Sequence, residues 1–395
     1  SMRIVAAVIC FVFLIPYTSS VYNGLSRLFE MAFHVPYAAC VIVMAALTCV
    51  YVFLGGYMAT AINDFIQGII MLFGITAVIV ATLNGQGGFY QAVRSLAEIP
   101  SEMPVTEGQV GAYTSFFGPD IVNLIGVVIL TSLGTWGLPQ MVQKFYAIRD
   151  EKAVQTGTII STVFAFVVAG GCYFLGGFGR LFDSAAIHNA DGSISYDGII
   201  PSMLSTLPEI LIGIVIVLVL SASMSTLASL VLTSSSTLTL DLIKGNIVKE
   251  MDEKKQVVVM RLFLIAFIVL SVVMAMNPPT FIAQLMGISW GALAGAFLAP
   301  FLYGLYWKGV TRASVWVCFI SAILITVLNL FPATKFIQSP INAGAAAMIA
   351  GLVIVPVVSL LTPKMDDGEI KFVFDCFEEK HMVEEKYALP SEDEK

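Results

Sequence analysis

The sequence predicts an all-α polytopic membrane protein, and three observations support this fold class. Of its 395 residues, 58% are hydrophobic and only 12% are charged, whereas a soluble domain carries about 25% charged residues. Many apolar runs approach the roughly 20 residues that a helix needs to cross the ~30 Å hydrocarbon core of a bilayer. These runs are continuously apolar, while the strands of a membrane barrel alternate between apolar and polar residues.

Ten apolar segments have the length of a membrane span, and we expect each to form a helix. The segment near 205–240 is longer than a bilayer is thick, so it is either strongly tilted or extends beyond the membrane. Residues 1–362 therefore form one transmembrane domain, and the polar, acidic residues 363–395 form a cytoplasmic tail. The predicted spans lie near 4–29, 34–55, 59–83, 119–139, 154–178, 205–240, 257–276, 279–305, 312–331 and 340–362.

The positions of the basic residues predict the orientation, because loops on the cytoplasmic side carry an excess of Lys and Arg. With both termini placed in the cytoplasm, only Arg27, Arg94, Arg180 and Lys335 of the 20 basic residues fall outside. We therefore expect both ends of this chain to be cytoplasmic. The inner segments hold Arg3, Lys144, Arg149, Lys152, Lys244, Lys249, Lys254, Lys255, Arg261, Lys308, Arg312, Lys364, Lys371, Lys380, Lys386 and Lys395.

Residues 221–241 are unusually rich in hydroxyl groups for a membrane helix. Ala222, Ser225 and Thr226 fall at helical spacing on one face, together with Ser229 and Thr233. Small and hydroxyl-bearing residues let membrane helices pack closely, which is one interpretation. The other is a site for a hard cation such as Na⁺, since hydroxyl and carbonyl oxygens are the ligands that such cations prefer.

An acidic residue, Asp64, lies about one turn inside the span predicted near 59–83. A carboxylate inside a membrane is costly and is therefore a functional hypothesis by default. The alternative is an acid at the level of the interface, hydrated from the cytoplasmic side.

Two predicted spans carry notable patterns: one has helix-breaking residues and the other has a sequence pattern known from hydrolases. Gly134, Gly137 and Pro139 lie close together at the inner end of one span and are expected to kink or unwind it. Transporters bind substrate at such interruptions, although a simple helix end also explains the spacing. The segment 287–291 has the G-x-S-x-G pattern of a hydrolase around Ser289, but it lies in an apolar helix instead of the strand-to-helix turn that the pattern requires.

Three stretches in this order and spacing resemble the sodium:solute symporter family: GGYMATAINDFIQG, GLPQMVQKFYAIRDEKAVQTG and SASMSTLASLVLTSSSTLTLDL. The C-terminal stretch AMNPPTFIAQLMGISWGALAGAFLAPFLYGLYW most resembles the proline and pantothenate branch. The resemblance implies a LeuT-type fold, in which two inverted five-helix repeats are related by a pseudo-two-fold axis. Family members have about three further helices before the point where this sequence starts, so the resemblance implies an N-terminally truncated fragment.

The resemblance also implies roles for individual residues. The sodium site falls on Ala222, Ser225 and Thr226, and Asp64 matches the family aspartate on the cytoplasmic exit route of the ion. Proline carriers have aromatic residues where this sequence has threonines, which argues against proline as the solute. The residues expected at the solute site and inner gate are Thr131, Thr135, Trp136, Pro139, Ser289 and Trp290.

The resulting expectation is a non-enzymatic secondary transporter of the cell membrane that couples Na⁺ entry to uptake of a small organic solute by alternating access. The solute is an amino acid, pantothenate, a sugar or a carboxylate, and the stoichiometry and the replacement of Na⁺ by H⁺ or Li⁺ stay open. The alternative is a symporter-like protein that does not transport, either a sensor or an inactive truncated fragment. Nucleic acid is not an expected partner, because the chain has a net charge of -7 and no clustered basic face.

Overall fold

Helices form the regular structure in the computed structural model, which describes residues 2–145, 148, 150–182, 187–188, 194–248 and 251–375. The side chains of 54–63 and 245–246 also lie outside the description. Over the described residues, extended pairing is limited to one isolated bridge between His188 and Ile194. Of the basic residues predicted on the cytoplasmic side, Arg149, Lys249, Lys380, Lys386 and Lys395 fall outside the described residues.

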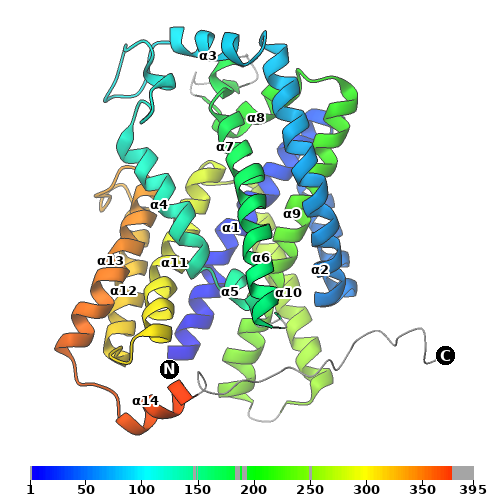
Figure 1. Ribbon diagram of the computed structural model, residues 1–395. Coiled ribbons are helices and arrows are strands. Elements are labelled where there is room, and N and C mark those ends of the chain that lie inside the picture. The colour runs from blue at the N-terminus through cyan, green and yellow to red at the C-terminus, as the bar shows by residue number, and fades with distance from the viewer. Residues whose placement is uncertain are drawn as a thin grey trace.

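The elements follow one another along the chain, with longer connections between α3 and α4 and between α12 and α13 (Figure 1). Most are α-helices, η1 and η3 are single 3₁₀ turns, and η2 and η5 are π-helical. In order they are α1 (Met2–Phe33), α2 (Tyr37–Gly85), α3 (Phe89–Glu98), η1 (Ala112–Thr114), α4 (Ile121–Gly137), α5 (Pro139–Phe145), α6 (Glu151–Phe164), η2 (Ala165–Ala169), α7 (Gly170–Gly176), η3 (Gly179–Leu181), α8 (Tyr196–Leu204), α9 (Glu209–Thr237), η5 (Leu238–Ile247), α10 (Glu253–Met276), α11 (Ile282–Tyr306), α12 (Arg312–Leu328), α13 (Pro340–Leu361) and α14 (Asp367–Phe374).

Among the described residues, 7 helices are long and apolar enough to cross a membrane, or 8 with the bent pair α4–α5 counted as one span. Two shorter apolar helices, Tyr37–Phe53 and Arg312–Leu328, accompany them. Each predicted span overlaps one of these segments, while the number of crossings stays a prediction. A single helix, α2, covers both of the spans predicted near 34–55 and 59–83. The long span predicted near 205–240 continues past its expected end, because α9 runs on into η5.

The helices break where the sequence limits the backbone. Residue Leu138 is extended because the proline that follows it disfavours a helical conformation, and α4 and α5 meet there at an angle of 48°. Similarly, α1 ends before Pro36, with His34 in the left-handed region at φ 55°. The interruption predicted from Gly134, Gly137 and Pro139 is therefore present at Leu138.

The helices form two groups that meet along α1 and α11. One group, at the left of Figure 1, contains α4, α11, α12 and α13, while α1, α2, α9 and α10 form the other. The two groups are held together because buried side chains from both of them join one hydrophobic cluster. This cluster includes Leu14, Tyr17, Leu227, Leu230, Phe267, Trp290, Leu293 and Met348.

The two ends of the molecule differ in character. One end holds the N-terminus and α14 and carries Arg3, Lys244 and Lys308; we call it the basic end (Figure 1). The opposite end carries α3 and α8, and we call it the loop end. The tail is helical where it begins, and Glu369 of α14 pairs with Arg312 at 3.0 Å; residues 376–395 lie outside the described residues.

Candidate functional site

Four hydroxyl groups of α9, those of Thr226, Ser235, Ser236 and Thr237, bond within their own helix. The Thr226 Oγ1 donates to the Ala222 carbonyl oxygen at 2.9 Å, and the Ser235 Oγ donates to the Val231 oxygen at 2.7 Å. Such bonds satisfy a hydroxyl hydrogen inside a helix and agree with the packing interpretation. They also leave the oxygen lone pairs of Thr226 free, so this hydroxyl can still accept a cation.

A cavity of about 570 Å³ lies at the loop end between α1, α8, α9 and α11. Ala222 and Thr226 are on its wall, and Ser20 of α1 brings a further hydroxyl to the same space. Ser225 is half-buried on the same helix but is not among the residues that line this loop-end cavity. Residues from two helices that carry carbonyl and hydroxyl oxygens therefore line one space, and such oxygens are the donors that suit Na⁺.

A second cavity, of about 500 Å³, lies at the basic end of the same helices. Trp136 and Pro139 line it from the α4–α5 break. Charges of both signs are present, because the Arg3 Nε lies 2.6 Å from the Asp241 Oδ1. Thr233 of α9 lines this basic-end cavity and donates to the Gln143 Oε1 at 2.8 Å, which ties α9 to α5.

A packed layer separates the two cavities. Along α9 the loop-end cavity extends as far as Thr226, and the basic-end cavity begins at Thr233. The corresponding gaps fall between residues 10 and 17 of α1 and between residues 286 and 297 of α11. The side chains in this layer are buried, and we call it the packed layer: Leu14, Leu227, Leu230, Val231, Trp290 and Leu293.

The residues predicted for the solute site and inner gate do not all share one space. Trp136 and Pro139 line the basic-end cavity, and Trp136 also lines, together with Thr135, a cleft between the α4–α5 pair and α11. Thr131 donates to the Val127 oxygen of its own helix at 2.8 Å. The structure therefore brings Trp136 together with Pro139 on one side and with Thr135 on the other, and Thr131 lines neither space.

Ser289 and Trp290 lie in or beside the packed layer. Ser289 is fully buried in α11 and donates to the Phe13 carbonyl oxygen of α1. The Trp290 ring packs edge-on against Tyr17, with ring centroids 5.6 Å apart. These contacts join α11 to α1, and they place Ser289 within a regular helix, away from the strand-to-helix turn of a hydrolase.

Asp64 lies opposite a basic side chain. Its Oδ2 is 3.8 Å from the Lys144 Nζ of α5. Its Oδ1 is buried and has no hydrogen-bond partner among the described residues. The carboxylate therefore keeps one oxygen with capacity to bind, beside a lysine that partly balances its charge.

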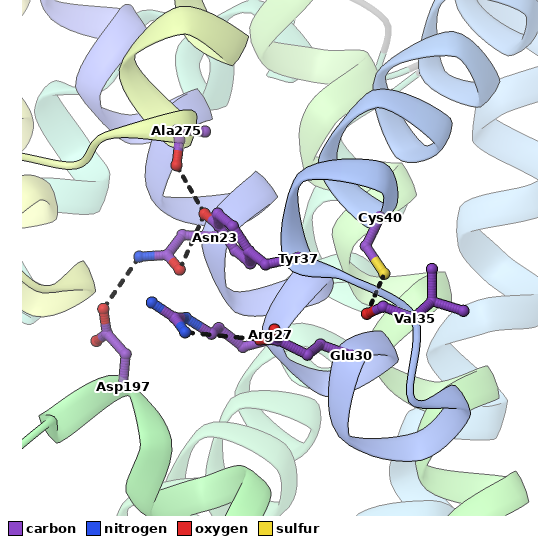
Figure 2. Close-up of polar contacts among 8 residues, drawn as sticks. All are labelled: Asn23, Arg27, Glu30, Val35, Tyr37, Cys40, Asp197 and Ala275. Carbon is purple, nitrogen blue, oxygen red and sulfur yellow. Dashed lines mark hydrogen bonds and ion pairs between the residues drawn. The ribbon is translucent and has the colours of Figure 1, made fainter. Parts of the chain in front are cut away.

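Sequence reasoning missed an acidic residue of the loop-end cavity, Asp197 of α8 (Figure 2). Its Oδ1 accepts from the Ile282 N–H at 3.0 Å, and its Oδ2 accepts from the Asn23 Nδ2 at 3.0 Å. Burial raises the pKa of this carboxyl, against the opposite effect of those two hydrogen bonds and of the nearby Arg27 guanidinium. The available signal was Asn23, an amide inside a predicted span that needs a partner there.

The chain was then compared with known proteins. The model of the family described as "Sodium:solute symporter family" matches residues 1–321. The chain is 29% identical over 395 residues to a sodium/proline symporter of Staphylococcus aureus, covering 98% of this chain and 74% of the relative. It belongs to the sodium:solute symporter family. A sodium/pantothenate symporter of Haemophilus influenzae is 30% identical over 286 residues, which cover 72% of this chain and 56% of the relative.

A solved structure shares the fold of this family member. It is a Na⁺-coupled sialic acid symporter in a substrate-bound, outward-open state, with a TM-score of 0.61 and 15% sequence identity over 92% of this chain and 84% of that chain. The predicted LeuT-type all-helical fold is confirmed by this likeness. As a member of the family, the protein is a multi-pass protein of the plasma membrane that couples Na⁺ to the symport of a small organic solute. The alternative of a sensor or an inactive fragment is not favoured.

Proposed function

We propose that this symporter binds Na⁺ at Ala222, Ser225 and Thr226 and carries its solute through the two cavities by alternating access. The observation that supports this most strongly is that the two cavities follow one another along the same three helices. The sodium residues Ala222 and Thr226 are on the wall of one cavity, and the helix-break residues Trp136 and Pro139 are on the wall of the other. Moving the packed layer would transfer access from one cavity to the other.

The solute is an amino acid, pantothenate, a sugar or another carboxylate. The loop-end cavity, at about 570 Å³, is within the roughly 300–1,000 Å³ range of small-molecule sites. Its wall combines aromatic rings, such as Tyr17 and Phe281, with hydroxyl groups. The related carriers for proline and pantothenate support a small polar organic molecule as cargo, moved without a chemical reaction on it.

We place the basic end in the cytoplasm, so that both ends of the chain are cytoplasmic and the loop-end cavity opens outside. The distribution of Lys and Arg supports this orientation. On this orientation Na⁺ leaves past Asp64, where Lys144 competes for the carboxylate as the ion departs. Trp136 and Pro139 form the inner gate, with Thr131 and Thr135 on the same helix, and Ser289 and Trp290 belong to the layer that rearranges.

Coupling follows from thermodynamic linkage. If Na⁺ and solute both favour the same conformation, each raises the affinity of the protein for the other by the same factor. Entry of one Na⁺ down a membrane potential adds about 2.3 kcal/mol per 100 mV to the driving force. Release into a cytoplasm poor in Na⁺ then resets the cycle.

The experiment is a thermal melt of the purified protein in NaCl against choline chloride. A ligand at 100 times its dissociation constant stabilises the folded state by about 2.7 kcal/mol, so wild type should melt at a higher temperature in NaCl. Thr226→Ala should shift the Na⁺ concentration for half-maximal stabilisation upward by about tenfold, because it removes an oxygen worth roughly 1.4 kcal/mol to a bound cation. Thr226→Ser keeps the hydroxyl and is the matched control.

Two results would count against the site. No Na⁺-specific shift in wild type would point to proton coupling and return the hydroxyl face of α9 to helix packing. A shift that is the same in Thr226→Ala and in wild type would remove Thr226 from the site.

A further inference from the structure

The loop helix α8 forms one wall of the loop-end cavity. Its residues Tyr196, Asp197, Ile200, Pro201 and Leu204 line the cavity together with the α9 residues proposed to bind Na⁺. In Figure 1 α8 lies at the loop end of the molecule. Whatever holds α8 in place therefore controls how open this cavity is to the loop side.

A single side chain ties α8 to two core helices. The Asp197 carboxylate accepts from the Ile282 N–H with both oxygens, at 3.0 and 3.3 Å, and from the Asn23 Nδ2 at 3.0 Å. Ile282 begins α11, and the preceding residue, Phe281, makes no side-chain cap for that helix. Asp197 therefore supplies the missing cap from a residue 85 positions away in the sequence.

The bond to Asn23 continues into the core (Figure 2). Asn23 is fully buried, and its Oδ1 lies 3.3 Å from the Tyr37 hydroxyl of α2. The Tyr37 hydroxyl donates at 2.7 Å to the Ala275 carbonyl oxygen near the end of α10. One chain of polar contacts thus reaches from α8 to α1, α2 and α10.

An aromatic contact adds a second tie between the same elements. The rings of Tyr196 and Phe281 lie with centroids 5.0 Å apart. Arg27 stacks on the Tyr37 ring at 4.7 Å and lies 3.6 Å from Glu30, so its charge is engaged within α1 and α2. Removing Asp197 would therefore leave the ring contact as the tie between α8 and the start of α11, while Met203 and Leu204 at the far end of α8 stay packed with Leu28 of α1.

We propose that Asp197 is a positioning residue that holds α8 against the start of α11 and against Asn23, and thereby closes the loop-end cavity over the sodium residues. On the transport function proposed above, this carboxylate sets how readily Na⁺ and solute enter from the loop side. Its role here is to position α8, since both of its oxygens are engaged by protein donors.

The test uses a cysteine as a reporter of access. Ser20 lines the cavity and is only 1% exposed, so Ser20→Cys, in a full chain whose 6 native cysteines are replaced by alanine, should react slowly with a charged maleimide. Adding Asp197→Ala should raise the labelling rate by about tenfold or more, because it removes three hydrogen-bond contacts that close the cavity. The measurement is made in choline chloride, so it does not depend on Na⁺ binding.

Asp197→Asn separates hydrogen bonding from charge. If the Asn23 amide turns over, its oxygen accepts from the new amide and its nitrogen donates to Tyr37, whose hydroxyl still donates to Ala275. The Ile282 N–H keeps its 3.0 Å contact to the remaining oxygen and loses only the longer one at 3.3 Å, so the ties to α11 and to Asn23 both survive and labelling should stay within about twofold of the parent. Glu102→Ala is the matched control, because Glu102 pairs with Arg180 at 3.0 Å at the loop end without lining the cavity.

The proposal is overturned if Asp197→Ala leaves the labelling rate unchanged, or if Glu102→Ala raises it equally, which would indicate general loosening. It is also overturned if Asp197→Asn labels as fast as Asp197→Ala. A melt in NaCl on the same proteins keeps the two hypotheses apart. Failure of the Na⁺ shift with faster labelling in Asp197→Ala would reject the sodium site alone.

Discussion

The Asp197 carboxyl titrates under opposing influences. Burial raises its pKa above the ordinary value of 3.8, while its two hydrogen bonds and Arg27 lower it. Because the net shift is upward, the folded protein binds this proton more readily than the unfolded chain does. The charged form therefore costs stability above the folded pKa, and this cost disappears as the pH falls through the folded pKa toward 3.8.

The upward shift of the Asp197 pKa gives a prediction for the variant Asp197→Asn, whose side chain does not ionise. Lowering the pH from 7.5 toward 3.8 should raise the melting temperature of wild type relative to the variant. The two proteins differ only at this residue, so the difference between their melting temperatures reports its charge. Scanning calorimetry of both proteins across this pH range is the measurement, and a constant difference would contradict the assigned environment.

Individual residues of the site could be predicted only where two residues lie close enough in the sequence for one helix to bring them together. Ala222 and Thr226 are four residues apart, so a helix alone brings them together, and both line the loop-end cavity. The pairing of Asn23 with Asp197 spans 174 positions, and no local pattern expresses it. Ser225 is the opposite case: its spacing placed it with Ala222 and Thr226, but it does not line the cavity. The face of α9 that meets the cavity depends on how α1 and α8 pack against it.

At the scale of elements, α11 depends on close approach to α13. A Cβ on Gly291 would lie 2.5 Å from the Gly344 Cα, which is a backbone atom and cannot rotate away. The two helices are therefore closer than side chains at this point would allow. The same helix carries Ser289 and Trp290, so this contact also positions the packed layer.

Gly291→Ala should destabilise the protein by about 1–3 kcal/mol through overpacking. Gly304→Ala is the matched control on the same helix, since nothing lies within 4 Å of its added Cβ. That control should be neutral or stabilising by up to roughly 1 kcal/mol, because alanine is the better helix former. Melting temperatures in detergent measure both, and equal effects would show that α11 and α13 are not in close contact.

The helices themselves were predictable because solid apolar runs and prolines act locally. The break at Leu138 follows from the residue after it, and the apolar runs locate α9 to α13 within a few residues. The apolar pattern gave two spans, near 34–55 and 59–83, and did not show that one element, α2, includes both of them.

At the scale of the whole molecule, the two ends should face different compartments. Val105 is 69% exposed at the loop end, so Val105→Cys should react with an impermeant thiol reagent in intact cells. Asp367→Cys, on exposed α14 at the basic end, should react only after permeabilisation. The reverse pattern would invert the proposed orientation.

The two cavities are a property of the whole molecule that no segment of sequence encodes. Each is lined by residues from at least four elements, and their separation depends on side chains from α1, α9 and α11 filling one level. The sequence shows that these side chains are apolar, but it does not show that they meet. Family resemblance supplied the sodium residues, while the arrangement of the layer required coordinates.

The apolar side chains of the packed layer limit the leakage of Na⁺ between the two cavities. Leu14, Leu227, Leu230 and Leu293 are fully buried, so a Na⁺ ion passing between the cavities without a conformational change would meet mainly hydrocarbon side chains there. The idealised cost of moving an ion into such a medium is of order 20 kcal/mol. Futile sodium slippage is therefore suppressed by the same leucines that pack the core, and the gradient is dissipated only when the carrier completes a turnover.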